Sequence, residues 1–331
     1  MKILVTGGAG YIGSFMVRRF LERGDEVTVL DNLSRGHKEA VDSRARLVEG
    51  DVSDESFIDS LFKENKFDSI LHFAGCISMA ESMENPSIYF KNNVFGALRL
   101  IENAVKNKVG SFIFSSTAGV YGNPMKIPIP EDHVTNPTNP YGESKLMVEK
   151  ILSWYNRIYG LNFASLRYFN AAGASLDARL GEKHNPETHI IPLAVKAALE
   201  GSELSLYGND YNTKDGTCIR DYIHVIDLVE SHLLVLDKLG RDNGGFFYNV
   251  GTGKGYSNKE VLEMVKKVSE IDFKVKIADK RPGDAEVLIA DPAKIKRELN
   301  FEPKYSSLET IVKTAWEWHN NNSKFKIQNS K

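Results

Sequence analysis

Short apolar runs alternate with helical patterns over the first 170 residues, and this alternation constrains the fold more than any other feature of the sequence. Continuous apolar runs predict buried strands at residues 3–5, 27–30, 46–48, 68–73 and 111–116. Apolar residues at helical spacing predict helices at residues 11–22, 57–62, 86–106 and 141–159. Strands that alternate with helices form a parallel sheet through right-handed crossovers. We therefore expect an α/β fold built on a doubly wound parallel sheet.

The alternation loosens after about residue 170. Residues 171–188 and 207–220 are typical of polar loops, and helical patterns return at residues 224–239, 257–269 and 307–319. A length of 331 residues also favours about two domains. We predict a Rossmann-like domain at residues 1–170 and a smaller C-terminal α/β domain at residues 171–331, with parts of residues 220–252 returning to the first sheet.

Three glycines follow the first predicted strand at a fixed spacing. Gly7, Gly10 and Gly13 fit the pattern G-x-x-G-x-x-G directly before and into a predicted helix. Glycine lets the backbone approach a pyrophosphate that a Cβ would block, and the helix N-terminus offers free N–H groups. Asp31 ends the second strand 18 residues after Gly13, near the spacing of a ribose-binding acid. Because this carboxylate would accept from both ribose hydroxyls and repel a 2′-phosphate, the sequence favours NAD over NADP; a glycine-rich turn of an unrelated α/β domain is the alternative.

Tyr141 and Lys145 form a second motif at the start of a predicted helix. The i, i+4 spacing places both side chains on one helix face. An ammonium group near a phenol, together with the positive nicotinamide ring of NAD, would lower the tyrosine pKa and make Tyr141 a general base near neutral pH. A chain of this composition contains such a pair by chance, and an ordinary surface pair is the alternative. The weight of the motif comes from residues 115–117, whose hydroxyls end the fifth strand and would reach the same crevice.

Longer motifs surround these residues in a specific order. They are T-G-G-A-G-Y-I-G, L-D-N-L, H-F-A-G, F-S-S-T-A-G-V-Y-G, N-P-Y-G-E-S-K and L-R-Y-F-N-A-A-G. From residue 2 to about residue 318 the chain resembles the extended short-chain dehydrogenase/reductase family, and within it the enzymes that epimerise UDP-hexoses at C4. The resemblance implies that UDP-glucose and UDP-galactose interconvert through a transient 4-keto sugar while NAD stays bound. It also implies that residues 1–170 bind NAD and residues 171–331 bind the nucleotide sugar.

The resemblance assigns roles to the catalytic motif. Tyr141 would take the O4 proton of the sugar, Thr117 would hydrogen-bond O4, and Lys145 would hold the nicotinamide ribose and tune Tyr141. The other positions that match cofactor-binding positions of the family are Gly7, Gly10, Tyr11, Ile12, Gly13, Asp31, Asn32, Asp51, Val52, Phe73, Ala74, Gly75, Asn92, Ser115 and Tyr168.

The same resemblance implies a substrate site in the C-terminal part. Besides Thr117 and Tyr141, the matching positions are Asn170, His189, Tyr207, Arg220, Arg281, Asp284 and Leu288. Arg220 and Arg281 would hold the diphosphate, which suits the fixed fork of donors in a guanidinium. Asn170 would bind the phosphates, Tyr207 would lie by the uridine, and Asp284 would bind the uridine ribose.

Three positions, Leu288, Ile77 and His189, lead to separate expectations about sugar choice, cofactor binding and phosphate binding. Leu288 would flank the C2 substituent of the sugar, and its intermediate size favours moderate activity on UDP-N-acetylhexosamines. Ile77 replaces a lysine that is common in the family, which removes one cofactor contact. His189 replaces a phosphate-binding asparagine of some members and could donate a hydrogen bond there.

Other enzymes of the family remain alternatives. A 4,6-dehydratase would need an Asp-Glu pair after Thr117, where this chain has Ala118 and Gly119, and we interpret Glu131 and Asp132 as surface charge. Decarboxylases and hexuronate epimerases would need a site for a C6 carboxylate, which the sequence does not settle. A non-catalytic NAD-binding sensor is disfavoured, since such proteins often lack the tyrosine or the lysine.

Composition and charge argue against several other classes of protein. A net charge of −2 argues against nucleic-acid binding. Cys76 and Cys218 have no metal-ligand spacing, so no metal is expected, and His224 and His232 are interpreted as ordinary helix residues. The chain has no signal peptide and no apolar run long enough to span a membrane, so a cytoplasmic enzyme is expected. Apolar residues on several faces of the helices at 86–106 and 141–159, where the family dimerises, predict a homodimer.

Overall fold

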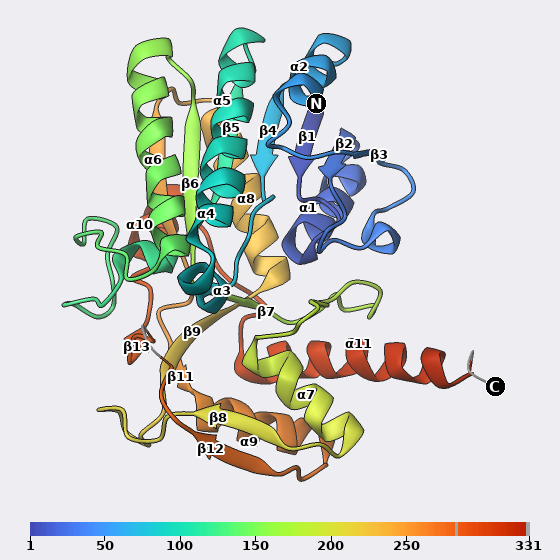
Figure 1. Cartoon of the computed structure of the whole chain (residues 1–331), viewed down its shortest axis with the longest axis vertical. Helices are drawn as coiled ribbons and strands as arrows, with labels where there is room; N and C mark the ends of the chain where they lie inside the picture. The colour runs from blue at the N-terminus through green and yellow to red at the C-terminus, as the bar shows by residue number, and fades with distance from the viewer. Residues whose placement is uncertain (282–283, 329–331) are drawn as a thin grey trace.

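The computed structural model describes residues 1–281 and 284–328, so Pro282 and Gly283 of the R-P-G-D motif lie outside the described residues. Figure 1 shows an upper part built on a large sheet and a lower part built on two small ones. The strands of the large sheet point their carboxyl ends toward the lower part, where ligands bind in folds of this kind.

The large sheet has seven parallel strands in the order β10-β6-β5-β4-β1-β2-β3. Their bounds are β1 (Lys2–Thr6), β2 (Glu26–Asp31), β3 (Arg46–Glu49), β4 (Ser69–His72), β5 (Ser111–Thr117), β6 (Phe163–Tyr168) and β10 (Gly245–Val250). The predicted doubly wound parallel sheet is confirmed. The strand order reverses between β4 and β1, which opens a crevice at their carboxyl ends.

Helices cover both faces of this sheet because its strands are apolar on both faces. In β1, Ile3 and Val5 belong to the core under α1 (Tyr11–Glu22), α8 (Val225–Leu239) and α10 (Ala293–Leu299). Leu4 belongs to the opposite core, under α2 (Glu55–Glu64), α5 (Gly96–Lys106) and α6 (Pro140–Tyr159).

The helix predicted at residues 86–106 is present and contains a π-helical turn. Short helices α3 (Met79–Glu84) and α4 (Pro86–Tyr89) are followed by a π-helical turn at Phe90–Phe95, which leads into α5. Such turns occur mostly inside α-helices and often at functional sites.

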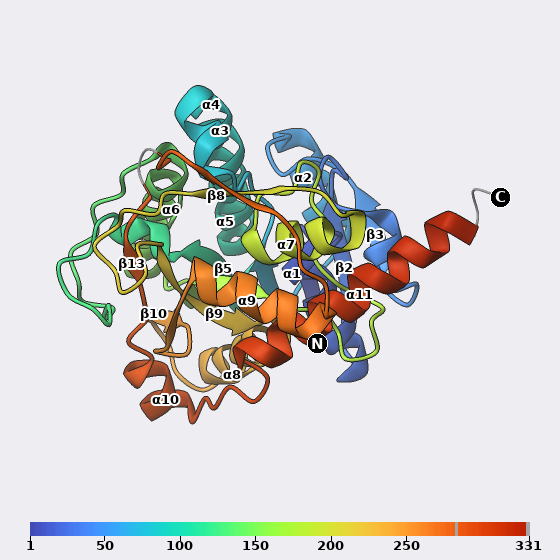
Figure 2. The same cartoon turned by 90° about the horizontal axis from the view of Figure 1, so that it is seen from below.

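The lower part combines short strands with three helices. β9 (Ile219–His224) pairs with β7 (Asn170–Ala172), β11 (Gly255–Ser257) and β13 (Val287–Leu288), and β8 (Leu204–Tyr207) pairs with β12 (Val275–Ala278). The helices α7 (Ile190–Glu200), α9 (Asn258–Ser269) and α11 (Leu308–Gln328) pack on one another (Figure 2). The last helix continues to Gln328. Apolar periodicity predicted its end at residue 319, because the residues that follow are mostly polar and carry no apolar pattern. Two 3₁₀ turns, at Lys38–Ala40 and Ala118–Tyr121, complete the structure. Within the described ranges, every helix is too short or too polar to cross a membrane.

Candidate active site

The glycine-rich turn joins β1 to α1. Gly7 has φ +70°, and a Cβ on it would lie 2.5 Å from the backbone nitrogen of Ala74. A Cβ on Gly13 would lie 2.1 Å from the carbonyl oxygen of Gly7, so this turn excludes larger residues at both positions. Gly10, the N-cap of α1, has no side chain that could cap the helix. The first N–H groups of α1 are therefore left to an anionic ligand such as a pyrophosphate.

Asp31 is buried beside this turn, at the carboxyl end of β2. Its Oδ2 accepts from the N–H of Ala9 at 3.0 Å, and its Oδ1 accepts from the N–H of Leu33 at 2.9 Å. Next to it, Nδ2 of Asn32 donates to Oδ2 of Asp51 at 2.9 Å, which ties the ends of β2 and β3 together. Three of the predicted polar cofactor residues thus lie at the carboxyl ends of β2 and β3, and Asp31 contacts the glycine turn.

The apolar cofactor candidates line the same edge of the sheet. Val52 is buried, and a Cβ on Gly96 would lie 2.7 Å from its side chain, so α5 packs closely on it. Phe73 and Ile12 pack against the buried core under α1. Residues 73–75 follow β4 directly, while Ile77 is exposed.

The start of α6 is fixed by its own sequence. Pro140 occupies the first helical position, where its missing N–H costs nothing. Asn139 caps the helix, since its Oδ1 accepts from the N–H of Gly142 at 2.9 Å. These two residues place Tyr141 and Lys145 in the first two turns of α6.

Tyr141, Lys145 and Thr117 converge at the carboxyl end of β5. The Lys145 ammonium donates to the carbonyl oxygen of Ser115 at 2.8 Å and lies 4.9 Å from the ring centre of Phe114. The Thr117 hydroxyl accepts from the N–H of Gly119 at 3.0 Å and lies close enough to the Tyr141 phenol to act on its pKa. The structure therefore brings together the three predicted catalytic residues, one from a strand end and two from a helix.

Burial is the largest cause of the pKa shifts of Tyr141 and Lys145. It raises the pKa of Tyr141, while Thr117 acts in the opposite direction. Burial also lowers the pKa of Lys145 to about 8. The side chains alone therefore do not produce the lowered Tyr141 pKa that we expected from Lys145 and the nicotinamide ring, because desolvation of the phenolate outweighs the effect of Thr117. A cation bound against the phenol would reverse the direction.

Asn93 is a site residue that the sequence analysis missed. It lies in the π-helical turn next to the predicted Asn92 and is buried. Its Oδ1 accepts from the N–H of Cys76 at 2.8 Å, and its Nδ2 donates to the hydroxyl of Ser144 at 3.1 Å. Asn93 thus clamps the loop after β4 to the helix that carries Tyr141. Two consecutive asparagines within an apolar helix could have been the signal.

Two buried histidines also lie close to this site. The Tyr168 hydroxyl hydrogen-bonds Nε2 of His232, and Nδ1 of His72 lies 2.7 Å from the Thr6 hydroxyl. Burial lowers the pKa of His72 to about 3 and that of His232 to about 4, so both are neutral at pH 7. His232 thus positions Tyr168 rather than being an ordinary helix residue, and His224 is not helical: it ends β9 and caps α8 through Nδ1, which accepts from the N–H of Ile226.

A buried ion pair fixes α6 on the sheet, and the sequence analysis did not predict it. Arg167 on β6 donates to both carboxylate oxygens of Glu149 on α6, at 3.0 and 2.7 Å. The Ser116 hydroxyl on β5 donates to the same carboxylate at 2.6 Å. Arg167 also donates to the Tyr121 hydroxyl at 2.8 Å. Arg167 and Glu149 are almost completely buried, so each charge depends on the other.

Glu131 corrects an expectation. It was interpreted as surface charge, but its carboxylate accepts from the N–H of Asn249 at 2.9 Å and it is largely buried. Its backbone carbonyl accepts from Arg167 at 3.1 Å. Glu131 therefore belongs to the framework behind the site, while Asp132 is exposed as expected.

The predicted substrate residues form two small groups in the lower part. The Arg281 guanidinium lies 5.0 Å from the ring centre of Tyr207 and donates to Asp284 at 2.9 Å. Leu288 of β13 pairs in register with Arg220 of β9. Asn170, on the neighbouring β7, donates from its amide to the carbonyl oxygen of Asp221 at 3.0 Å and so lies against β9.

His189 lies apart from these contacts, at the N-cap of α7. Its Nδ1 lies 2.5 Å from Glu182 and 3.6 Å from Glu187. Burial opposes the charged form of His189, but the two carboxylates outweigh burial and raise its pKa. The structure thus places His189 in an acidic cluster that the sequence analysis did not predict.

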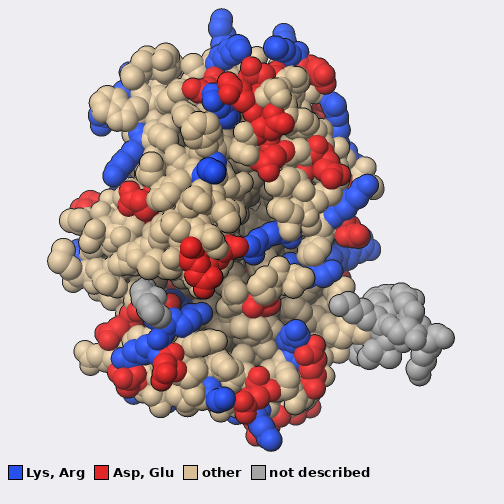
Figure 3. Space-filling view, in the orientation of Figure 1, with Lys and Arg blue, Asp and Glu red and all other residues tan. Residues whose placement is uncertain are grey.

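Acidic and basic side chains are interspersed over the face of the molecule in Figure 3. The residues present fit a dinucleotide. The glycine turn leaves room that a Cβ would fill, the α1 N-terminus offers donors, and Asp31 offers a carboxylate at the next strand.

Comparisons with known proteins agree with this geometry. A UDP-glucose 4-epimerase of Halalkalibacterium halodurans is 47% identical over 320 residues, which cover 96% of each chain. The crystal structure of UDP-glucose 4-epimerase from Brucella ovis in complex with NAD is 42% identical, covers 96% of this chain and 97% of its own, and superposes with a TM-score of 0.91. The UDP-Glc/GlcNAc 4-epimerase from Campylobacter jejuni is 45% identical, with coverage of 97% and 99% and a TM-score of 0.83. The sequence profile of the NAD dependent epimerase/dehydratase family matches residues 3–251. The chain belongs to the NAD dependent epimerase/dehydratase family.

Proposed function

We propose that this protein interconverts UDP-glucose and UDP-galactose by epimerisation at C4, with NAD as its resident cofactor. The observation that carries the proposal is the convergence of Tyr141, Lys145 and Thr117 at the end of β5, next to a turn that fits a dinucleotide. The curated relatives named as UDP-glucose 4-epimerases support it over nearly the whole chain.

The chemistry follows from the placement of these three side chains beside the cofactor turn. NAD, when bound, supplies the hydride acceptor for the oxidation at C4. Tyr141 takes the proton from O4 and returns it after the sugar has turned over, and Thr117 hydrogen-bonds O4 and keeps the phenol aligned. Lys145, held by the Ser115 carbonyl, places its ammonium toward the nicotinamide ribose.

We also propose that the two parts of the chain bind different ligands. Residues 1–170 hold the cofactor through the candidate residues around the glycine turn. Residues 171–331 hold the nucleotide sugar: Arg220 and Arg281 bind the diphosphate, and Tyr207 and Asp284 bind the uridine. Asn170 binds the phosphates, and Nε2 of His189 is left to donate to them, since Nδ1 of His189 is engaged by Glu182.

A dehydratase reaction is less well supported. Ala118 and Gly119 form a 3₁₀ turn after Thr117 and carry no proton-transferring groups. Glu131, the nearest sequence candidate for an acid, has its carboxylate bound to the backbone of Asn249.

We further propose a homodimer that packs through α4–α6. Large apolar side chains are exposed there; they are Ile88, Phe90, Phe95, Trp154, Ile158 and Tyr159. Such a concentration of exposed apolar surface is typical of a protein interface. Sedimentation of the wild type should give twice the monomer mass, and Trp154→Glu with Ile158→Glu should shift it toward the monomer.

The function is tested by incubating the full-length protein with UDP-galactose, UDP-glucose and their N-acetyl forms and separating the products. We expect UDP-glucose and UDP-galactose to interconvert, and slower conversion of the N-acetyl forms past Leu288. A dehydrated keto sugar as the product, or no conversion at all, would overturn the proposal.

A further inference from the structure

The segment between β7 and α7 gathers four metal-ligating side chains away from Tyr141. Glu182, His184, Glu187 and His189 lie in one short stretch of sequence, and one ligand atom from each lies within 4.8 Å of the others. The side chain of Glu182 is 5% exposed, and those of His184 and Glu187 are 16% and 12% exposed, whereas that of His189 is 51% exposed. The cluster thus has three largely buried members and opens to solvent at His189.

Several distances within the cluster are close to the edges of a coordination tetrahedron. Zinc–nitrogen and zinc–oxygen bonds of 2.0–2.2 Å give ligand–ligand edges of roughly 3.3–3.6 Å. Nδ1 of His184 lies 3.3 Å from Oε1 of Glu182 and 3.6 Å from Oε2 of Glu187, while Oε1 of Glu187 lies 3.6 Å from Nδ1 of His189. Another pair, Nδ1 of His189 with Oε1 of Glu182, is at 2.5 Å and needs to open by about 1 Å to reach such an edge.

The His184 imidazole and the Glu187 carboxylate are available to bind a metal ion. Nδ1 of His184 is buried, and among the residues that the structure describes it has no hydrogen-bond partner of acceptable geometry. Glu187 is oriented by the backbone, since its Oε1 accepts from the N–H groups of Thr188 and His189 at 2.8 and 2.9 Å. The carboxylate of Glu187 is therefore held toward the cluster before any ion arrives.

We propose that Glu182, His184, Glu187 and His189 form a binding site for a divalent transition metal, with Zn²⁺ as the preferred ion. Two imidazole nitrogens and two carboxylate oxygens suit Zn²⁺ and Co²⁺, whereas Mg²⁺ and Ca²⁺ prefer oxygen ligands alone. Two carboxylates also balance the charge of the ion, so the filled cluster is neutral.

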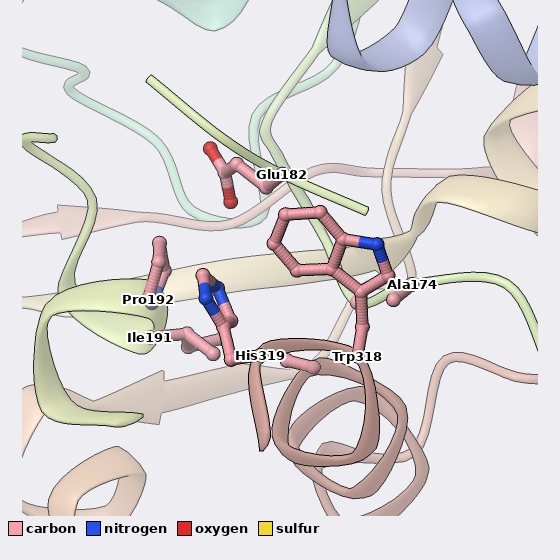
Figure 4. A pocket seen from close by; sticks show the side chains of 8 residues that line it. Ala174, Glu182, Ile191, Pro192, Trp318 and His319 are labelled. Carbon is pink, nitrogen blue, oxygen red and sulfur yellow. The ribbon is translucent and has the colours of Figure 1, made fainter. Parts of the chain in front are cut away.

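The site would fasten the loop that crosses between the two parts of the molecule. The Tyr11 hydroxyl donates to the carbonyl oxygen of Gly173 at 2.6 Å, and Arg18 forms an ion pair with Asp177, so the loop is tied to α1. On its other side, a Cβ on Gly181 would lie 2.4 Å from the Trp318 ring of α11. Figure 4 shows Glu182 in the pocket that Trp318 and His319 line. An ion in the cluster would lock this loop between α1 and α11.

The test uses the full-length protein, stripped of metal with a chelator and dialysed, without any UDP-sugar, so its outcome is independent of the proposed function. Elemental analysis after re-equilibration with micromolar Zn²⁺ should give one ion per chain. Co²⁺ should produce the intense visible absorption of a four-coordinate site, and saturating Zn²⁺ should raise the melting temperature by roughly 3–10 °C.

Variants distinguish Zn²⁺ binding at the cluster from adventitious Zn²⁺ binding elsewhere on the protein. His184→Asn and Glu182→Gln should each weaken Zn²⁺ binding at least tenfold, whereas His133→Asn, a histidine on another loop, should leave binding unchanged. Circular dichroism checks that each variant is folded. Less than 0.2 equivalents of Zn²⁺ in the wild type, or unchanged Co²⁺ absorption in a folded His184→Asn protein, would overturn the proposal.

Discussion

The two halves of the candidate site are held in different ways. In the upper part, Asp31 is 8% exposed and Lys145 is 3% exposed, and each is fixed by a backbone partner. In the lower part, Tyr207 is 41% exposed and the side chain of Arg281 is 48% exposed, and their contacts are mainly with each other and with Asp284. The upper half is assembled before a ligand arrives, whereas the lower half presents side chains that a ligand would order. We infer that the chemistry depends on the rigid half and the choice of sugar on the adaptable half.

The largest expected effect is on chemistry in the rigid half. Tyr141→Phe removes the group that accepts the O4 proton and keeps the ring, so turnover should fall by about 10²–10⁴-fold. Thr117→Val should cost less if water replaces the hydroxyl. Tyr155→Phe, on the same helix but outside the site, is the matched control. Turnover of Tyr141→Phe within a few-fold of the wild type would remove Tyr141 from the mechanism.

The second prediction tests whether the ion pair between Arg167 and Glu149 makes the upper half rigid. Arg167→Leu leaves Glu149 buried without its partner, and the free energy of unfolding in urea should fall by about 3–5 kcal/mol. The double variant Arg167→Leu, Glu149→Leu should recover most of this loss, because no buried charge remains. If the single and double variants are equally destabilised, packing rather than the ion pair fixes α6.

Cofactor choice probes the upper half through Asp31. Replacing Asp31 by Ser and Asn32 by Arg removes the carboxylate and adds a cation, so affinity for NADP should rise by about 10–100-fold, as for a hydrogen bond to a charged group. Affinity for NAD should fall, since the loop also loses its bond to Ala9. Dissociation constants for both cofactors, measured by calorimetry, check this. A wild type that binds both cofactors equally would contradict the role of Asp31.

Sugar choice probes the adaptable half through Leu288. A larger ring should crowd an N-acetyl group at C2, so Leu288→Tyr should lower kcat/KM for UDP-N-acetylglucosamine by roughly 10–200-fold. The values for UDP-glucose and UDP-galactose should change little. Equal loss on all sugars would mean that Leu288 supports β13 rather than gating the pocket.

The smallest expected effect is a pH dependence of stability set by buried neutral histidines. The pKa of His72 is lowered by burial from 6.5 to about 3, so below pH 6.5 the unfolded chain binds a proton that the folded chain does not. Stability should therefore fall as the pH falls from 6.5 toward 3, by about 1 kcal/mol for this group between pH 7 and 5.5. Urea unfolding of the wild type and of His72→Asn at both pH values measures the difference. An identical pH slope in the two proteins would show that His72 binds its proton equally in the folded and unfolded chains.

Local motifs made much of the upper half predictable. The strand and helix periods predicted the parallel sheet, and the glycine spacing, the strand-end Asp31 and the helix start at Tyr141 pointed to residues that lie together in the structure. The lower half was harder, because its strands are only two to six residues long and carry little periodicity. Strand β6 and helix α7 were not predicted from the sequence at all.

The sequence by itself determined what depends on neighbours a few residues apart: the glycine turn, the Asn139–Pro140 helix start, and the pairing of Tyr141 with Lys145 on one face. The tertiary structure alone decided what depends on distant segments meeting. It placed Arg167 against Glu149, set Glu131 behind the site, and closed the cluster from Glu182 to His189 against α11. It also decided the direction of the Tyr141 pKa, because the energy of an ionised group depends on how completely the fold removes water from it, and that burial is not encoded in any short stretch of sequence.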